Sequence, residues 1–281
     1  MPLPPRARPD GLVEVADRVW GVRAESAGRN AALVAGSGGV AVVDDLGCAD
    51  PDDNADTADP ADPVRTAVRR LGRGDVLAVV LSHGHPASWA GAAGRPRAGD
   101  VPLVVHEAAA ASLGAGTHRL VRTVSSVTAI DLGDRVLEVV HPGRSHTGGD
   151  LVVRVPDVEV VVVGDLLTGD GPPSYGPECW PLEWPASLDL VLQLMGGSGS
   201  ALAVPGRGPL LERSAVEEQR DGIATVAETI RELAGRGVPE DRALAQGLAD
   251  GSWPWPGEQL SEAVRRGYAQ LPRGAVRLPL A

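Results

Sequence analysis

The sequence predicts an α/β protein, folded as a four-layer αβ/βα sandwich with extra C-terminal helices. Two consecutive halves each combine short apolar segments with helical ones, and the chain from about residue 211 has helical periodicity throughout. Two mixed halves of this kind pack as two facing sheets with helices outside. We expect a single domain over residues 1–281, whose helical extension covers about residues 211–281.

Runs rich in Val, Leu and Ala, separated by Gly-rich turns, predict the strands of the first half. These strands are expected at Leu12–Val15, Arg18–Arg23, Asn30–Ala35, Gly39–Asp44, Val76–Leu81 and Pro102–Val105. Apolar residues at helical spacing predict helices over Pro63–Leu71 and Glu107–Leu113. The segment at about 49–62, rich in Asp and Pro, cannot bury apolar surface, and we expect a solvated loop there.

The second half repeats this pattern. Its strands are expected at Leu120–Val124, Thr128–Asp131, Arg135–Val140, Leu151–Val155, Val158–Val163 and Ala201–Val204. A loop over Gly169–Trp184 leads to a helix over Ala186–Met195. The extension is expected to form helices over Arg213–Gly235, Glu240–Gly247 and Pro256–Leu271.

Composition limits the kinds of partner. A net charge of −11 argues against nucleic acid, whose phosphates require a positive surface. No apolar run approaches the roughly 20 residues that span a bilayer, and no signal segment opens the chain. We therefore expect a cytoplasmic protein that acts on a small molecule, without a membrane or nucleic-acid partner. The oligomeric state is left open.

Four polar side chains lie where predicted strands meet loops. His83 and His85 follow the strand Val76–Leu81, His146 lies in a Gly-rich turn, and Asp165 follows a valine-rich strand. Three imidazoles and a carboxylate are a suitable ligand set for Zn²⁺. The sequence therefore predicts a site for a divalent metal at His83, His85, His146 and Asp165.

The order and spacing of these motifs resemble the metallo-β-lactamase superfamily, and in detail its glyoxalase-like metallo-hydrolases. The matching stretches are His83-Gly84-His85, Ser145-His146-Thr147, Gly164-Asp165 and Pro205-Gly206-Arg207-Gly208. The resemblance extends from Gly11 to about Arg213. It implies the sandwich fold, a first metal on His83, His85 and His146, and an Asp165 that normally bridges two metals.

The same resemblance places the ligands of a second metal at Ala87, Ser88 and Arg207, none of which suits that role. A dinuclear centre is therefore not expected, and the second metal site is degenerate. We expect at most one divalent metal, zinc by the family resemblance, with a metal-free protein as the alternative. Our hypothesis is that Arg207 pairs with Asp165 in place of the missing ion and stabilises charge on the substrate.

Aromatic residues near these motifs are candidates for substrate binding. Tyr175 and Trp180 lie in the Pro- and Gly-rich loop where the family places a substrate wall, and Trp89 follows the lost ligands. Such a wall suits an aromatic or acyl substrate. For Trp184, core packing is an equal alternative.

Other polar residues have a structural interpretation beside a functional one. Thr147 and Asp150 either orient His146 or only form its turn. For His106, His118 and His141 a surface or hydrogen-bonded role is favoured, and for Cys48 and Cys179 a structural one.

Three functions fit this sequence. In the first, one metal lowers the pKa of a water toward about 7 for hydrolysis of an ester, thioester or lactone, with Asp165 as base and Arg207 as charge stabiliser. In the second, the site catalyses a non-hydrolytic step, such as a cyclisation in natural-product biosynthesis. In the third, the protein is a metal-free pseudoenzyme that only binds a ligand.

Overall fold

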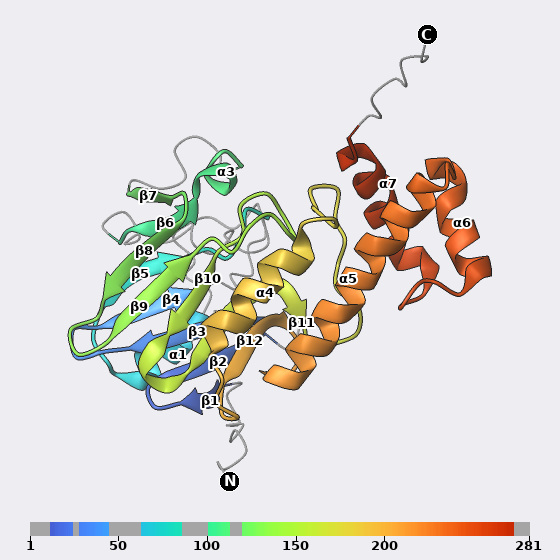
Figure 1. Ribbon diagram of the computed structural model, residues 1–281. Coiled ribbons are helices and arrows are strands. Elements are labelled where there is room, and N and C mark those ends of the chain that lie inside the picture. The colour runs from blue at the N-terminus through green and yellow to red at the C-terminus, as the bar shows by residue number, and fades with distance from the viewer. Residues whose placement is uncertain (1–11, 25–27, 45–62, 86–100, 113–119, 273–281) are drawn as a thin grey trace.

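The computed structural model describes residues 12–24, 28–44, 63–85, 101–112 and 120–272 (Figure 1). The expected acidic loop at about 49–62 lies outside these residues. The first half contains β1 (Leu12–Ala16), β2 (Val19–Ala24), β3 (Arg29–Ala35), β4 (Val40–Val43), α1 (Pro63–Leu71), β5 (Val76–Val80), β6 (Leu103–His106) and α3 (Glu107–Ala110). The second contains β7 (Val121–Val124), β8 (Val127–Asp131), β9 (Val136–Val140), β10 (Val152–Val155), β11 (Val160–Thr168), α4 (Trp184–Met195), β12 (Leu202–Arg207) and β13 (Leu211–Glu212).

The strands form two halves that meet along one seam. The order is β7-β6-β5-β4-β3-β12-β11-β10-β9-β8, with β2 beside β3 and β13 beside β12. At the seam, the only paired residues of β3 and β12 are Arg29 and Arg207. The seam therefore brings the start of β3 next to the end of β12.

Alternating side chains on the strands build the layers. In β4, Val40 and Val42 face the apolar cluster under α1, whereas Ala41 and Val43 face the cluster between the two halves. In β11, Val160 and Val162 point into that same middle cluster, and the residues between them point to the cluster under α4 and α5. Successive strand residues point to opposite faces, so three clusters separate four layers. The expected sandwich is confirmed.

The C-terminal helices are α5 (Arg213–Gly235), α6 (Glu240–Asp250) and α7 (Ser261–Gln270), the last preceded by a 3₁₀ turn at Gly257–Leu260. Figure 1 shows α5 running past α4 and on to α6 and α7, which stand beyond the end of the sandwich. Glycine at 222 and 247 lets the rings of Trp255 and Trp253 lie against helices α5 and α6. No helix among the described residues is long and apolar enough to cross a membrane.

Each predicted strand and helix has a counterpart in the structure, but several ends differ: α6 extends to Asp250, and α7 begins at Ser261, after the 3₁₀ turn. The strand expected to end at Val163 continues to Thr168, so Asp165 lies within β11 instead of after it. Its pairing with β12 shifts register around Gly164, which has a φ of 54°. The short strand β13 was not predicted.

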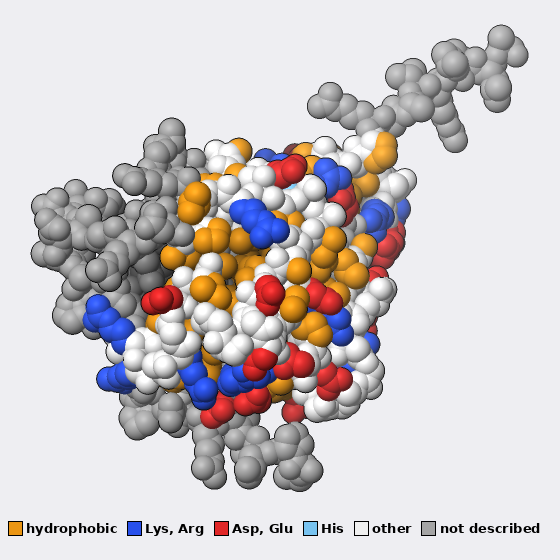
Figure 2. Space-filling model, turned by 90° about the vertical axis from the view of Figure 1, so that its left-hand side faces the viewer, with side chains coloured by type: hydrophobic (Ala, Val, Ile, Leu, Met, Phe, Trp, Pro, Cys, Tyr) orange, Lys and Arg blue, Asp and Glu red, His pale blue; other side chains and the backbone are white. Residues whose placement is uncertain are grey.

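Strands β7 and β8 are the edge strands at the two ends of the strand order. Figure 2 views the side of the molecule that carries β7 to β9 and shows apolar side chains interspersed with charged ones. The large apolar side chains exposed on these strands and just before β7 are Leu120, Val121, Val127 and Val136.

Candidate metal centre

Three imidazole rings converge at one end of the sandwich. The ring centroid of His83 lies 4.8 Å from that of His85 and 5.0 Å from that of His146, and the centroids of His85 and His146 are 4.9 Å apart. Each pair of ring planes is within a few degrees of perpendicular. Each ring offers one nitrogen, and these three atoms lie within 4.8 Å of one another. The cluster predicted from the sequence is therefore formed.

Hydrogen bonds on the outer side fix the orientation of two of these rings. The Nδ1 of His146 lies 3.0 Å from the carbonyl oxygen of Ser174, to which it donates as an N–H. The Nδ1 of His83 lies 2.9 Å from the hydroxyl oxygen of Ser82. The bond to the Ser174 carbonyl leaves the Nε2 of His146 with its lone pair, and the Nε2 atoms of His83 and His146 both lie on the side of Asp165.

The geometry of the cluster fits a tetrahedral metal. Ligand nitrogens about 2.0–2.1 Å from Zn²⁺ at tetrahedral angles are separated by about 3.3 Å. Here the Nε2 of His146 and the Nδ1 of His85 are 3.2 Å apart. One pair of nitrogens therefore has the spacing of a tetrahedral ion, and the third histidine lies close enough to complete a three-histidine group that could hold a metal.

Burial keeps two of the imidazoles neutral. Desolvation lowers the pKa of His146 to about 4 and, with the neighbouring His146, lowers the pKa of His83 well below its usual value. A metal ligand must present a neutral imidazole, so this burial prepares both rings to bind a metal at neutral pH.

The carboxylate of Asp165 faces the same centre. Its Oδ2 lies 3.7 Å from the Nε2 of His83 and 3.8 Å from that of His146, and its side chain is only 8% exposed. Burial raises the pKa of the Asp165 carboxyl, whereas the charges of His83 and His146 when these rings are protonated, together with those of Arg29 and Arg207, lower it; the net direction is downward.

The guanidinium closest to Asp165 belongs to Arg29 and not to Arg207. The Nη2 of Arg29 lies 3.3 Å from Asp165 Oδ2, with its side chain 16% exposed. Among the described residues, the ion pairs of Asp165 are with Arg29, His83 and His146, so the expected direct contact with Arg207 is wrong. Arg207 is exposed and lines a small cavity together with Asp165.

Two glycines hold the backbone close to these groups. A Cβ at Gly206 would lie 1.9 Å from Asp165 Oδ1, so only glycine leaves room for the carboxylate. A Cβ at Gly164 would lie 2.4 Å from the hydroxyl of Ser82. The Pro205-Gly206 and Gly164-Asp165 motifs are thus steric requirements of the site.

Behind His83, a buried carboxylate fixes Ser82. Asp44 has a φ of 58° and accepts a hydrogen bond from the Ser82 backbone N–H at 2.8 Å. Burial raises the pKa of Asp44, and although hydrogen bonds from Ser82 act in the opposite direction, the net value is about 6. Sequence reasoning missed Arg29, Ser82 and Asp44; the position of Ser82 directly before His83 was the one local signal.

Thr147 and Asp150 form the turn that carries His146. The Asp150 carboxylate accepts from the N–H and the hydroxyl of Thr147, each at 2.8 Å. Burial raises the pKa of Asp150 to about 7, against these hydrogen bonds. Of the two interpretations, turn formation is confirmed, because the carbonyl of Ser174 is what orients the His146 ring.

The predicted aromatic wall is only partly placed beside the site. Tyr175 lies with its ring 5.2 Å from that of Trp184, which is fully buried and lies 5.9 Å from His146. The ring of Trp180 lies under the guanidinium of Arg144, at 3.8 Å. Trp184 is therefore core, and substrate contact by Tyr175 and Trp180 stays a prediction.

Trp89, Ala87, Ser88, His118 and Cys48 lie outside the described residues. The remaining predictions concern groups away from the centre. The His106 ring accepts a hydrogen bond from the Ala108 N–H at the start of α3 and stacks on His141 at 4.1 Å, while the Nδ1 of His141 is hydrogen-bonded to the Asp150 carbonyl. Cys179 is buried, and burial raises the pKa of its thiol to about 12, which agrees with a structural role.

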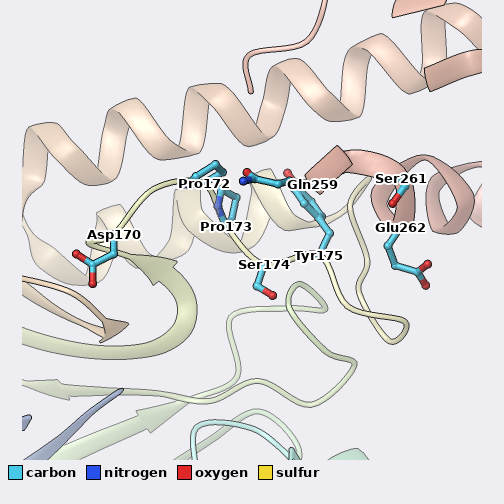
Figure 3. Close-up of a pocket in the computed structure, with 8 residues that line it drawn as sticks. All are labelled: Asp170, Pro172, Pro173, Ser174, Tyr175, Gln259, Ser261 and Glu262. Atoms are coloured by element: carbon cyan, nitrogen blue, oxygen red, sulfur yellow. The ribbon is translucent and has the colours of Figure 1, made fainter. Parts of the chain in front are cut away.

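Two cavities adjoin the centre. The smaller, of about 90 Å³, lies between Asp165 and Arg207. The larger, of about 410 Å³, lies between the loop after β11 and the start of α7 (Figure 3). Asp170, Pro172 and Ser174 line both cavities, which places the larger one next to the metal centre.

The sequence and the fold were compared with known proteins. A family model described as the metallo-beta-lactamase superfamily matches residues 27–226. A metallo-beta-lactamase type 2 from Bacillus cereus is 29% identical over 92 residues, which is 32% of this chain and 35% of that protein. The chain thus aligns with about a third of this curated relative.

Solved structures share the fold at low sequence identity. A metallo-beta-lactamase from Pontibacter korlensis has a TM-score of 0.61 at 21% identity, covering 75% of this chain and 97% of that chain. The stereoselective inverting sec-alkylsulfatase Pisa1 from Pseudomonas sp. has a TM-score of 0.68 at 16% identity, covering 92% of this chain and 50% of that one. The metallo-beta-lactamase FIM-1 from Pseudomonas aeruginosa, in its mono-zinc form, has a TM-score of 0.57 at 20% identity, covering 76% and 93%.

Proposed function

Because the chain belongs to the metallo-β-lactamase superfamily, we propose that it is a hydrolase that uses one divalent metal, zinc in the first instance, and acts on an ester, thioester or lactone. The observation that carries this proposal is the convergence of His83, His85 and His146, whose ligand atoms lie within 4.8 Å of one another, with Asp165 beside them. The mono-zinc form of FIM-1 supports it, as a relative in fold that holds a single zinc.

The proposed metal would supply Lewis-acid chemistry, lowering the pKa of a water toward about 7 and polarising a carbonyl oxygen. The three histidines would hold it, and the bonds from Ser82 and Ser174 keep two of their rings in place. Asp165 is within reach of the centre and would orient the attacking water and accept its proton.

Arg29 would take the electrostatic place of a second cation. Its partly buried guanidinium lies 3.3 Å from Asp165 and supplies a positive charge there. The positive charge of Arg29, with that of the exposed Arg207, would stabilise the oxyanion that develops on the substrate. Arg29 would thereby share the charge-stabilising role that the sequence analysis assigned to Arg207 alone.

One observation favours the non-hydrolytic alternative. The pKa of Asp165 is lowered, and a weaker base is less able to accept a proton from water. A biosynthetic cyclase that needs charge stabilisation without water attack would suit such a site. The metal-free binding protein is the remaining alternative.

A substrate panel with metal control separates these functions. Purified protein, stripped with a chelator and then reloaded with zinc, is assayed on p-nitrophenyl esters, acyl thioesters, lactones and alkyl sulfates. The proposal expects turnover that needs the metal and is lost in His146→Ala. Zinc binding without turnover of any member would contradict hydrolysis and favour the non-hydrolytic alternative.

A further inference from the structure

The larger cavity has a wall from the sandwich and a wall from the C-terminal helices. The loop after β11 provides Asp170, Pro172, Pro173, Ser174 and Tyr175, as Figure 3 shows. The 3₁₀ turn and the start of α7 provide the opposite wall, which consists of Gln259, Ser261 and Glu262. The extension therefore completes a binding space that the sandwich alone does not enclose.

This cavity is connected to the metal centre through Ser174. That residue lines both cavities, and its carbonyl accepts the hydrogen bond from His146. A molecule whose reacting bond lies at Asp165 can thus extend past Ser174 into the larger cavity. Because Asp170 lines both cavities and Glu262 only the larger, Glu262 marks the distal end.

The chemistry of the lining favours a cation on an alkyl stem. Rings of Pro172, Pro173 and Tyr175 offer apolar contact, and the face of a tyrosine ring attracts ammonium groups. Among the described residues, the charged side chains that line the cavity are those of Asp170 and Glu262. Each also pairs with an arginine that does not line the cavity: Asp170 with Arg23 at 3.6 Å, and Glu262 with Arg265, whose Nε donates to both carboxylate oxygens. An ammonium group at Glu262 would therefore share or replace an ion pair whose arginine is half exposed.

Tyr175 adds a hydrogen-bonding group that has no partner. Its side chain is 7% exposed, and among the described residues its hydroxyl oxygen makes no hydrogen bond. A buried hydroxyl left in this state costs free energy unless another molecule supplies the partner. A polar group on a bound ligand would supply it.

We propose that the cavity between Tyr175 and Glu262 binds an alkylammonium group at the end of the substrate distal from the bond that reacts. The inference rests on the proposed function, since it defines the substrate class as an ester, thioester or lactone with an amine-bearing chain. Glu262 is the anionic anchor, and the Tyr175 ring is the apolar contact.

Binding is tested without catalysis, on the full chain stripped of metal. Calorimetric titration with n-butylammonium, n-butanol and butyrate compares a cation, a neutral group and an anion on one stem. We expect the ammonium to bind at least about fivefold more tightly than the other two, as a charge-assisted hydrogen bond in a half-buried site allows. Equal affinities, or tighter binding of butyrate or butanol, would overturn the proposal.

Two variants locate the binding. Glu262→Gln is expected to abolish the preference for the ammonium, and Tyr175→Phe to weaken its binding about threefold while keeping the ring. The control is Glu228→Gln, which likewise removes a carboxylate paired with an arginine three residues later on a helix, but one that does not line the cavity. A preference that persists in Glu262→Gln, or that Glu228→Gln removes equally, would overturn the proposal.

Turnover on matched esters separates this proposal from the hydrolytic one. With zinc bound, esters whose acyl chain ends in an ammonium should have a lower KM than those that end in a methyl or hydroxyl group, and Glu262→Gln should remove the difference. Ammonium binding without any hydrolysis would contradict the proposed function and leave this site supported. Hydrolysis without a preference for the ammonium in either assay would contradict the proposed ammonium site and leave the proposed hydrolytic function supported.

Discussion

The Arg29 guanidinium lies 3.3 Å from the carboxylate of Asp165, although 136 residues separate the two in the chain. The seam between β3 and β12 produces this contact, because it pairs Arg29 with Arg207 directly beside β11. The centre therefore combines three imidazoles with one carboxylate that a partly buried cation accompanies.

Replacing Arg29 should affect turnover more than replacing Arg207. Arg29→Gln removes the buried charge next to Asp165, and loss of one such group typically costs on the order of 100-fold in kcat. Arg207→Gln removes an exposed charge, which solvent screens, and should cost about tenfold or less. Steady-state kinetics on the best ester, with metal content measured in parallel, makes the comparison. A larger loss in Arg207→Gln would contradict the assignment of Arg29.

Ser82 should control metal affinity through His83. Ser82→Ala removes the hydroxyl that holds the Nδ1 of His83, and loss of such a partner typically weakens metal binding by about 10- to 100-fold. Zinc affinity is measured by competition with a chromophoric chelator. Ser200→Ala, on an exposed hydroxyl far from the centre, is the control and should bind zinc as the parent does. Unchanged affinity in Ser82→Ala would show that this bond does not position the ring.

Gly206→Ala should displace Asp165. The new methyl would lie 1.9 Å from Oδ1, so the carboxylate or strand β12 has to move. We expect a loss of about 1–3 kcal/mol in the free energy of unfolding, typical of overpacking at a buried position. Urea unfolding measures it, with Gly199→Ala as the control, since a Cβ at Gly199 meets no atom within 4 Å. Equal stability of the two variants would contradict the close contact.

Asp150 should make the metal-free protein less stable as pH rises. Its pKa is about 7 in the folded state, against an ordinary value of 3.8 for an aspartate. A carboxyl whose pKa is raised on folding contributes stability that is complete below the unfolded pKa and is lost as pH rises through the folded one. The loss due to Asp150 therefore falls between about pH 4 and pH 7.

Asp44, whose pKa is raised to about 6, acts in the same direction, whereas the lowered pKa of His146 acts in the opposite one. The contribution of Asp150 is therefore measured as the difference in pH dependence between the parent protein and a variant that lacks this carboxyl. The free energy of unfolding of Asp150→Asn should fall less between pH 5 and pH 8 than that of the parent, in urea titrations with chelator present. Parallel pH profiles would contradict the assignment to Asp150.

The sequence was sufficient for the sandwich and for the three histidines. Valine-rich runs with alternating faces identified β4 and β11, and the His83-Gly84-His85 motif with His146 gave the ligands that converge in the structure. Strand alternation and the spacing of His83 and His85 are local signals, whereas His146 lies 61 residues beyond His85 and was assigned from its Gly-rich turn and from the family resemblance. The assignment to the glyoxalase-like branch stays a prediction.

The pairing of Arg29 with Asp165 could not be predicted from local sequence patterns. Arg207 stands where the resemblance placed a ligand, whereas Arg29 opens a strand in the other half and becomes its neighbour only through the seam. Two like charges at paired positions disfavour convergence on one carboxylate, and the more buried Arg29 makes the contact. The two-walled cavity likewise depends on how α7 is placed, which no local pattern specifies.

The most direct test of a mononuclear centre is the metal content per chain, by elemental analysis after reconstitution with zinc and removal of excess. The account predicts about one zinc per chain, retained in His141→Ala and lost in His83→Ala and His146→Ala. About two per chain would contradict the degenerate second site, and none would contradict the metal centre itself.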